Sequence, residues 1–418
     1  MSPRAGTTGP HTLAFVESPV QLLNVLEWAH VHAHALSPEG AGGPASAVSA
    51  RAGSTRNGGK VPGQALRRWR RGQSRATRHA GSTASSAASV GGLTLVVLSP
   101  VDPMTRGQLR RMAELAREEG HEVRWEDARA GTSAPFRTIG GLAPLLRRTR
   151  RIVMGDPFSR YVQVLLNITK ARDLVVVDDG TATMEFVSQL ARGERLVRWH
   201  RKAQRPGARD LLFIPVSSKA RRRLTPGGRR RVEIFSSMPI EDTPEGVEVT
   251  YNDFAWTRSR FGPPHIAEGA DMVGTSLVET GVVDADRYRD AVRALAKAHG
   301  VTRYFAHRRE SPEKLQDLAA CTGLEMVRPD LPLELIARRG PIGRTILSFP
   351  STVVHTLPLA LAGTDVKVAV CDIDPAWLTA NASPRAQGFL SGVTGSARDV
   401  QRVSTDSGRP TKEAKATG

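Results

Sequence analysis

Two adjacent carboxylates, Asp178 and Asp179, follow the apolar run of residues 174–177 and precede Gly180. Four apolar residues, three of them β-branched, that end at a turn signal predict a buried strand. In open α/β sheets, ligands bind outside the carboxyl ends of the strands. Two acids placed there can raise each other's pKa, so that one acts as a base near neutral pH. The alternative is an ordinary loop with a helix cap, since Asp and Thr both cap helices well.

A histidine and two arginines occupy a similar position in the second half of the chain. His307 follows the predicted strand Thr302–Ala306, and Arg308 and Arg309 come next. The carboxyl end of a strand is where a ligand would lie, and guanidinium groups bind phosphate with bidentate geometry. The simpler interpretation is a structural or solvated histidine beside surface arginines.

Ser351 and Thr352 lie between a predicted strand, Thr345–Phe349, and a predicted helix, Ser351–Ala362. Hydroxyls and backbone N–H groups at a helix N-terminus form an anion site, although the same residues could be an ordinary cap. Glu334 lies in the first turn of a short predicted helix. Its carboxylate could bind ribose hydroxyls, or it could simply favour the helix dipole.

Strands and helices alternate along the chain, which predicts parallel sheets with helices on both faces. The fold class is therefore α/β, with two Rossmann-like domains facing each other across a cleft. The other predicted strands are Thr12–Val16, Leu93–Leu98, Glu122–Trp125, Arg151–Gly155, Asp271–Gly274, Leu324–Val327 and Lys367–Cys371. The other predicted helices are Gln21–Ala33, Thr105–Glu119, Phe158–Thr169, Asp284–His299, Pro312–Thr322 and Leu331–Arg338.

Composition along the chain predicts the domain boundaries. Residues 1–36 begin the N-terminal domain, and residues 93–224 complete it, with Leu211–Ile214 as its closing segment. The remaining predicted segments are a disordered basic insert at 37–92, a linker at 225–269, a C-terminal nucleotide-sugar domain at 270–390 and a disordered tail at 391–418.

The formal net charge is +18, and its distribution is uneven. Residues 40–92 contain nine basic residues and no acidic one, and a second basic run covers residues 221–231. Solvated basic loops are one interpretation. The other is contact with an anionic partner, either an acidic polysaccharide, a lipid head-group surface or nucleic acid. A base-stacking surface is not favoured, because Trp69 is the only aromatic residue within the basic runs.

The two cysteines, Cys321 and Cys371, form neither a metal-ligand spacing nor a disulfide framework. Neither a signal peptide nor an apolar stretch long enough to span a bilayer is visible in the sequence. We therefore expect a cytoplasmic protein, and peripheral contact of its basic loops with the inner face of the plasma membrane stays open.

The order of these motifs resembles that of the bacterial polysialyltransferases and lipooligosaccharide sialyltransferases of two-domain GT-B fold. That family carries an (Asp/Glu)-(Asp/Glu)-Gly motif, a His-Pro motif and a Ser-Ser/Thr pair, which correspond here to Asp178-Asp179-Gly180, His307 and Ser351-Thr352. The segments Glu17–Asn24 and Gly274–Glu279 also resemble the first strand–helix junction and the start of the second domain. The resemblance extends from about Thr12 to about Leu378, apart from the basic insert. It departs at Arg308, where the family has proline.

This resemblance implies transfer of sialic acid from CMP-sialic acid to a hydroxyl of a cell-surface or capsular glycan, with inversion and without a cofactor or a metal. Asp179, or Asp178, would be the base, and His307 would protonate or hydrogen-bond the departing phosphate. Ser351 and Thr352 would hold that phosphate, and Glu334 would hold the cytidine ribose or base. Arg308 and Arg309 would add positive charge, and the residues that resemble a substrate loop are Ser18, Gln21 and Asn24.

Three alternatives stay open at this point. One is a GT-B transferase that uses another nucleotide sugar. The second is a non-catalytic protein that binds anionic glycans, for which the departure at Arg308 is the sequence argument. The third is a nucleic-acid-binding protein that uses the basic insert. The excess of basic residues mildly favours an anionic glycan as acceptor.

Overall fold

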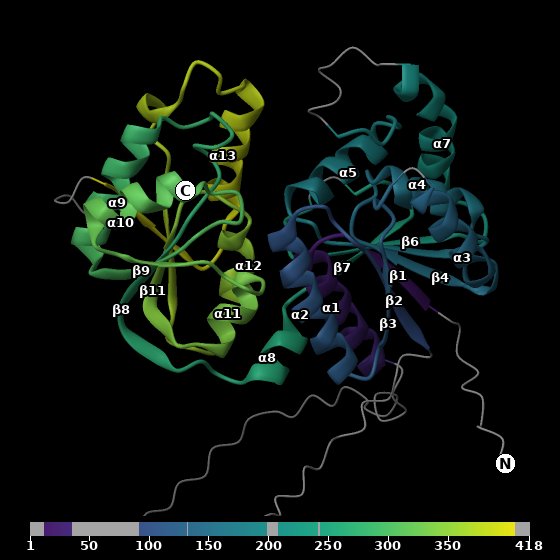
Figure 1. Ribbon diagram of the computed structural model, residues 1–418, viewed down its shortest axis with the longest axis horizontal. Helices are drawn as coiled ribbons and strands as arrows, with labels where there is room; N and C mark the ends of the chain where they lie inside the picture. Colours follow the sequence, from purple (N-terminus) through teal and green to yellow (C-terminus); the bar gives the residue numbers. More distant parts are fainter. Residues whose placement is uncertain (1–11, 36–91, 132, 199–207, 241–242, 406–418) are drawn as a thin grey trace, which may run out of the picture.

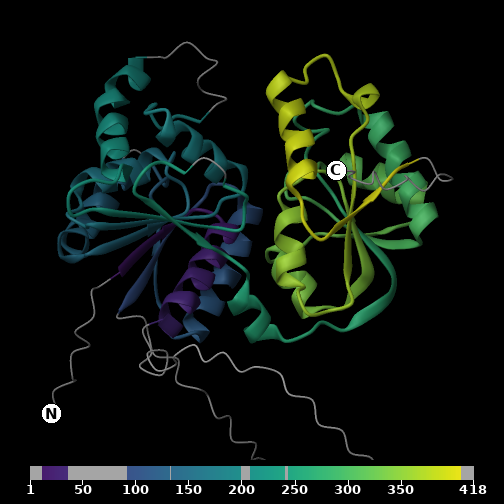
Figure 2. The same ribbon diagram turned by 180° about the vertical axis from the view of Figure 1, so that it is seen from behind.

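Two α/β domains stand side by side in the computed structural model, joined at one end by a short helix (Figure 1). The structure describes residues 12–35, 92–131, 133–198, 208–240 and 243–405. The same two halves are seen from behind in Figure 2. Among the residues that the structure describes, no helix combines the length and the apolar character needed to cross a membrane.

The N-terminal domain is built on a seven-stranded parallel sheet in the order β3-β2-β1-β4-β5-β6-β7. Its strands are β1 (Thr12–Val16), β2 (Leu93–Leu98), β3 (Glu122–Glu126), β4 (Arg151–Met154), β5 (Asp173–Val177), β6 (Arg231–Ser236) and β7 (Val247–Tyr251). Its helices are α1 (Pro19–Ala35), α2 (Pro103–Glu118), α3 (Ala134–Arg148), α4 (Arg160–Ile168), α5 (Thr181–Ala191) and α7 (Ala208–Leu224).

Alternate residues of each strand point to opposite faces of this sheet, so each strand contributes to two hydrophobic cores, one on each face. Leu13 and Phe15 of β1 pack with α3, α4, α5 and α7 on one face. Ala14 and Val16 pack with α1 and α2 on the other. Both faces of a parallel sheet are buried in this way, which explains the continuous apolar runs of the central strands.

The C-terminal domain has a six-stranded parallel sheet in the order β10-β9-β8-β11-β12-β13. Its strands are β8 (Ile266–Val273), β9 (Val301–Phe305), β10 (Glu325–Val327), β11 (Ile342–Ser348), β12 (Lys367–Cys371) and β13 (Val400–Val403). Its helices are α9 (Ala285–His299), α10 (Pro312–Thr322), α11 (Leu333–Arg339), α12 (Val353–Ala360) and α13 (Pro384–Ser396), and α8 (Ala255–Phe261) joins the domains.

Each sheet has one point where the strand order reverses. In the N-terminal sheet the chain runs outward from β1 through β2 to β3 and then returns to β4 beside β1. In the C-terminal sheet it runs from β8 through β9 to β10 and returns to β11 beside β8. The loops on either side of such a point separate, and a crevice opens at the carboxyl ends of the strands. The fold-class prediction of two Rossmann-like domains around a cleft is confirmed.

The structure corrects several sequence assignments. Residues 225–269 are not a simple linker, because β6 and β7 lie within them and extend the N-terminal sheet. The tail is ordered as far as β13, which pairs with β12. Both β7 and β13 are edge strands whose residues are exposed or half-buried and mix polar with apolar side chains, so averaged composition conceals them.

Other differences concern helices, since α5, α8 and α13 were also not predicted. Leu211–Ile214 does not close the domain but lies inside helix α7. Helix α3 was not predicted, because its two glycines and an internal proline are poor helix formers. The basic insert was predicted at residues 37–92. All of it except Gly92 lies outside the described residues.

Candidate active site

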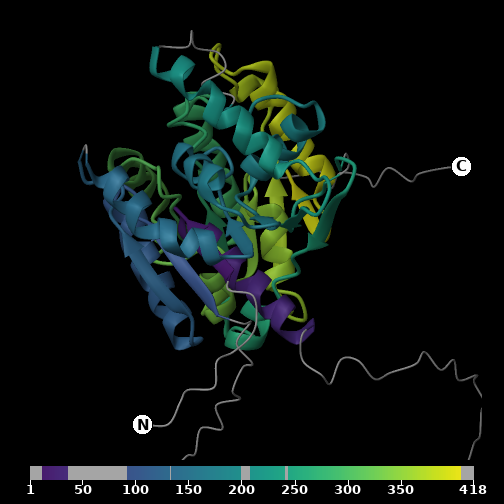
Figure 3. The ribbon, with the colours of Figure 1, turned by 90° about the vertical axis from the view of Figure 1, so that its right-hand side faces the viewer.

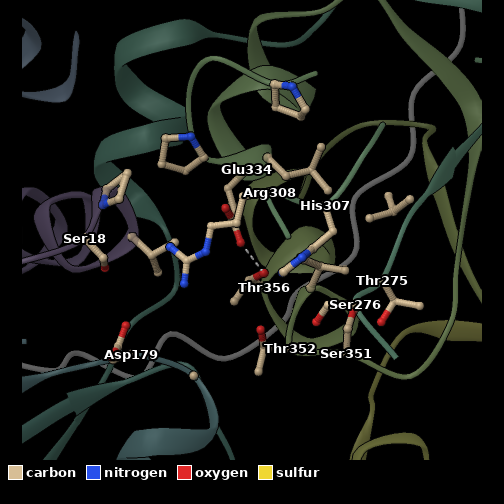
Figure 4. Close-up of a pocket in the computed structure, with 18 of the residues that line it drawn as sticks. Ser18, Asp179, Thr275, Ser276, His307, Arg308, Glu334, Ser351, Thr352 and Thr356 are labelled. Carbon is tan, nitrogen blue, oxygen red and sulfur yellow. Dashed lines mark hydrogen bonds between the residues drawn. The ribbon is translucent and has the colours of Figure 1, made fainter. Parts of the chain in front are cut away.

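A cleft of about 450 Å³ lies between the carboxyl ends of the two sheets and is lined by both domains. It brings together nearly all of the predicted site residues (Figure 4). Those that line it are Ser18, Asn24, Asp178, Asp179, His307, Arg308, Arg309, Glu334, Ser351 and Thr352. Gln21 is the exception, since it is buried behind this lining.

The two acids of the Asp-Asp-Gly motif have different environments. Asp178 is only 2% exposed, and its carboxylate accepts hydrogen bonds from Ser237 Oγ at 3.0 Å and from Gly180 N at 3.0 Å. Asn24 donates to the Asp178 carbonyl at 2.9 Å. These bonds occupy the Asp178 side chain and fix the backbone of the motif. Asp179 keeps a fifth of its side chain exposed and faces the cleft.

Asp179 has the electrostatics of a base that works near neutrality. Burial raises its pKa to about 7, the negative charge of Asp156 adds to this increase, and Arg198 opposes it. The Arg198 guanidinium lies 2.7 Å from Asp156 and 3.8 Å from Asp179, so it is shared between the two carboxylates. Gln21, behind the lining, hydrogen-bonds to Asp179.

A fourth carboxylate, that of Glu17, lies near Asp156. Glu17 follows β1 and accepts hydrogen bonds from Ser159 Oγ at 2.5 Å and from Arg129 at 2.7 Å. Burial raises its pKa. The loops after β1, β4 and β5 therefore bring together Glu17, Asp156 and Asp179, and each of these three has an arginine within 4 Å.

The opposite wall gathers hydroxyls and cations. Thr275 and Ser276 follow β8, whereas Ser351 and Thr352 follow β11 and precede α12. These four residues flank the strand-order reversal of the second sheet, and Figure 4 shows their hydroxyls grouped beside His307. Hydroxyls and backbone N–H groups at such a point form an anion site.

His307 is neutral in this environment and presents a donor. Burial lowers its pKa to about 4, and the positive charges of Arg308, Arg309 and Lys314 act in the same direction. Its Nδ1 accepts a hydrogen bond from Arg309 N at 3.2 Å, which leaves the ring proton on Nε2. An anion beside Nε2 would receive that hydrogen bond.

A buried polar network fixes the loop that carries His307. Glu310 accepts from His307 N at 2.6 Å and from Tyr304 Oη at 2.6 Å. Lys314 Nζ lies 2.8 Å from Glu310 and donates to the Thr275 carbonyl at 3.0 Å. Gly274 is packed against this network, because a Cβ there would lie 2.1 Å from Glu310 Oε2. The network thus holds the Thr275 and His307 loops in one arrangement.

Glu334 lies deeper in the cleft on α11. It is 5% exposed, and its carboxylate accepts from Thr356 Oγ1 at 2.5 Å. Burial raises its pKa. A buried carboxylate that lines a cavity is suited to accept a hydrogen bond from a ligand hydroxyl or amine.

The two walls are in contact, and charged side chains of one wall also interact with those of the other. A Cβ at Gly180 would lie 2.9 Å from Thr352 Cγ2, so glycine is required for this approach as well as for its φ of +66°. Arg308 extends from the C-terminal domain toward Asp179 (Figure 4), and it interacts with the charges of Asp179 and Asp102. Gln108 donates to the Pro329 carbonyl at 2.8 Å, which adds a further bond between the domains.

Sequence reasoning missed Asp156, Arg198, Arg328 and the network around Glu310. Asp156 had a usable signal, because it follows a predicted strand just as Asp178 does. Arg198 had none, since it reaches Asp156 across 42 residues of sequence. Within the described part of the chain, no group of three or more His, Cys, Asp or Glu side chains could hold a metal ion.

No family model matches the sequence, and no curated protein matches it. Solved structures are similar to it at low sequence identity. The α/β-galactoside α-2,3-sialyltransferase of Photobacterium phosphoreum is 8% identical, with a TM-score of 0.44 and coverage of 94% of this chain and 99% of that one. The GT-B domain of a Photobacterium damselae sialyltransferase is 9% identical, with a TM-score of 0.40 and the same coverages. The Escherichia coli heptosyltransferase WaaC, with ADP-2-deoxy-2-fluoro heptose, is 11% identical, with a TM-score of 0.37 and coverages of 94% and 92%.

Proposed function

We propose that this protein is an inverting glycosyltransferase that moves sialic acid from CMP-sialic acid to a glycan hydroxyl. The observation that carries the proposal is the pairing of the two walls. Asp179, a carboxylate with a pKa of about 7, faces a group of hydroxyls, a histidine donor and arginines across one cleft. The order of the Asp-Asp-Gly, His and Ser-Thr motifs supports sialic acid as the transferred sugar.

In this reaction, the Asp179 carboxylate accepts the proton of the acceptor hydroxyl. The hydroxyl oxygen then attacks the anomeric carbon of the donor from the face opposite the phosphate, and the bond from that carbon to the phosphate oxygen breaks. The bonding electrons leave with the phosphate. Ser351, Thr352 and the Nε2–H of His307 stabilise the charge that develops on the leaving group.

Glu334 and Thr356 form the candidate nucleoside subsite. The Glu334 carboxylate would accept a hydrogen bond from a ribose hydroxyl or from the exocyclic amine of cytosine. An apolar replacement would leave that ligand group unpaired in a buried site, which costs more than a missing contact at the surface. Ser18 and Asn24 line the cleft and Gln21 hydrogen-bonds to Asp179, so these residues of the predicted substrate loop would contribute to the acceptor side.

A transferase that uses a nucleoside-diphosphate sugar is the second candidate. Three arginines line the same cleft as the serine and threonine residues, namely Arg308, Arg309 and Arg328. Three guanidinium groups suit a diphosphate as well as they suit a phosphate next to a sugar carboxylate.

Calorimetric binding and thermal shift with CMP, CMP-sialic acid, UDP and GDP separate these candidates. A ligand that binds only the native state raises its apparent stability according to its affinity. Selective stabilisation by CMP and CMP-sialic acid, followed by transfer to a glycan acceptor, supports the proposal. Stabilisation by UDP or GDP instead identifies the second candidate, and no response to any nucleotide contradicts both.

A further inference from the structure

Three large apolar side chains of the N-terminal domain are exposed at the beginnings of two helices. Phe136, in the first turn of α3, is 78% exposed. Leu211 and Leu212, in the first turns of α7, are 53% and 81% exposed. Single exposed apolar residues need no explanation, but a group of them often marks an interaction site.

The first turn of α4 lies between the beginnings of α3 and α7 and contacts both. Tyr161 Oη donates to the carbonyl of Pro135, the neighbour of Phe136, at 3.2 Å. Arg160 forms an ion pair with Asp210, the neighbour of Leu211, and its guanidinium lies 5.2 Å from the ring centroid of Phe213. We call Phe136, Leu211 and Leu212 the apolar rim.

The helices behind the apolar rim are strongly basic. The sequences of α3, α4 and α7 contain nine arginine or lysine residues and one acidic residue, Asp210. Helices α1 and α2, on the opposite face of the same sheet, contain four arginines and three glutamates. The basic residues of α3 and α7 that are exposed to solvent include Arg137, Arg147, Arg148, Lys219 and Arg222. Helices α3, α4 and α7 therefore carry an excess of eight basic residues over acidic ones, whereas α1 and α2 carry an excess of one.

The apolar rim lies on the same edge of the sheet as the candidate active site. Helices α3 and α4 follow β3 and β4, so their first turns lie at the carboxyl ends of the strands, where Asp179 also lies. Arg160 joins the first turn of α7 to that edge. Helix α7 stands at the top of the molecule in Figures 1 and 3, at the opposite end from α8.

We infer that the α3–α4–α7 face docks on an anionic phospholipid bilayer, with the apolar rim inserted at the level of the head groups. An interfacial segment needs apolar side chains beside a basic polar face, and binding then combines buried apolar area with attraction to anionic lipids. Nucleic acid would match the charge, and the exposed ring of Phe136 could stack on a base, but Leu211 and Leu212 offer neither a ring for stacking nor hydrogen bonds to bases. The inference does not depend on the proposed function.

Flotation of the full chain with vesicles tests this inference. We expect binding to vesicles of phosphatidylglycerol and phosphatidylcholine, weaker binding to pure phosphatidylcholine, and a decrease in binding as salt is added. The double variant Leu211→Glu/Leu212→Glu and the single variant Phe136→Glu should each lower the partition coefficient by roughly tenfold or more, because they remove the inserted apolar area. Val101→Glu is the matched control, since Val101 is 76% exposed but lies outside the rim.

Two further measurements make the result decisive. Amide hydrogen exchange on the unmodified protein should show that vesicles protect the first turns of α3 and α7. Deletion of residues 40–92 tests whether the basic insert accounts for binding instead. The inference is overturned if the rim variants bind vesicles as the unmodified protein does, if binding is lost only with the insert, or if the protein binds RNA but not vesicles.

Discussion

The two crevices of this molecule have the same topology and opposite chemistry. In the N-terminal sheet, the loops after β1, β4 and β5 bring together Glu17, Asp156 and Asp179. In the C-terminal sheet, the loops after β8, β9 and β11 bring together hydroxyls, His307 and arginines. The shared strand order therefore determines where ligand-binding side chains lie, whereas the loop sequences determine which side chains they are. One wall holds a carboxylate whose pKa lies near neutrality, and the other wall carries groups that can bind an anion.

The largest effect should follow removal of the carboxylate wall's base. Asp179→Asn should lower the transfer rate by roughly a thousandfold, which is typical of losing a general base, while nucleotide affinity is preserved. Initial rates and calorimetric nucleotide binding provide the two readouts. If Asp178→Asn gives the same loss without changing the melting temperature, the assignment of roles between the two acids is wrong.

The next effect concerns the anion wall. Ser351→Ala/Thr352→Ala should weaken nucleotide binding and lower kcat/KM by roughly a hundredfold, since each hydroxyl stabilises charge on the phosphate. Ser311→Ala, at the cap of α10, removes a comparable hydroxyl away from the cleft and serves as control. Equal losses in both variants would indicate a stability effect and not an anion site.

The pH dependence of kcat/KM tests whether Asp156 raises the pKa of Asp179. Because the Asp179 base must be unprotonated, kcat/KM should rise with pH up to about 7 and then level off. Asp156→Asn removes a negative charge that raises the Asp179 pKa. It also removes the carboxylate that shares Arg198, so the positive charge of Arg198 stabilises the Asp179 carboxylate more strongly. The rising limb should therefore move to lower pH, by roughly one unit.

Asp173→Asn provides the matched control for this profile. Asp173 lies at the opposite end of β5 and pairs with Arg151 at 3.8 Å. Its replacement should leave the limb where it is. A limb that stays in place in Asp156→Asn, or shifts upward, contradicts the tuning argument.

The smallest effect should come from the network beneath the anion wall. Glu310→Gln keeps the shape of the side chain but weakens its bonds to Lys314 and His307 N. We expect a several-fold rise in the nucleotide dissociation constant with a smaller change in kcat, since Glu310 positions a loop and touches no reacting atom. A change in kcat alone would contradict a positioning role.

Sequence patterns predicted the central strands and the site residues that directly follow them. Runs such as residues 174–177 are continuous and apolar because both faces of their sheets are covered. The edge strands β7 and β13 were missed, because their half-exposed residues carry no such pattern. Arg198 and the Tyr304–Glu310 bond depend on tertiary contacts, which local spacing does not encode.

The close approach of Gly180 and Thr352 suggests a route to inhibition. The gap between them cannot accommodate one methyl group, so a small molecule that enters it would act as a wedge between the domains. Such a compound would touch both walls, because Thr352 belongs to the anion wall and Gly180 directly follows Asp179 of the carboxylate wall. Because Thr352 is assigned to the donor phosphate, a saturating concentration of the nucleotide-sugar donor should relieve inhibition by this compound.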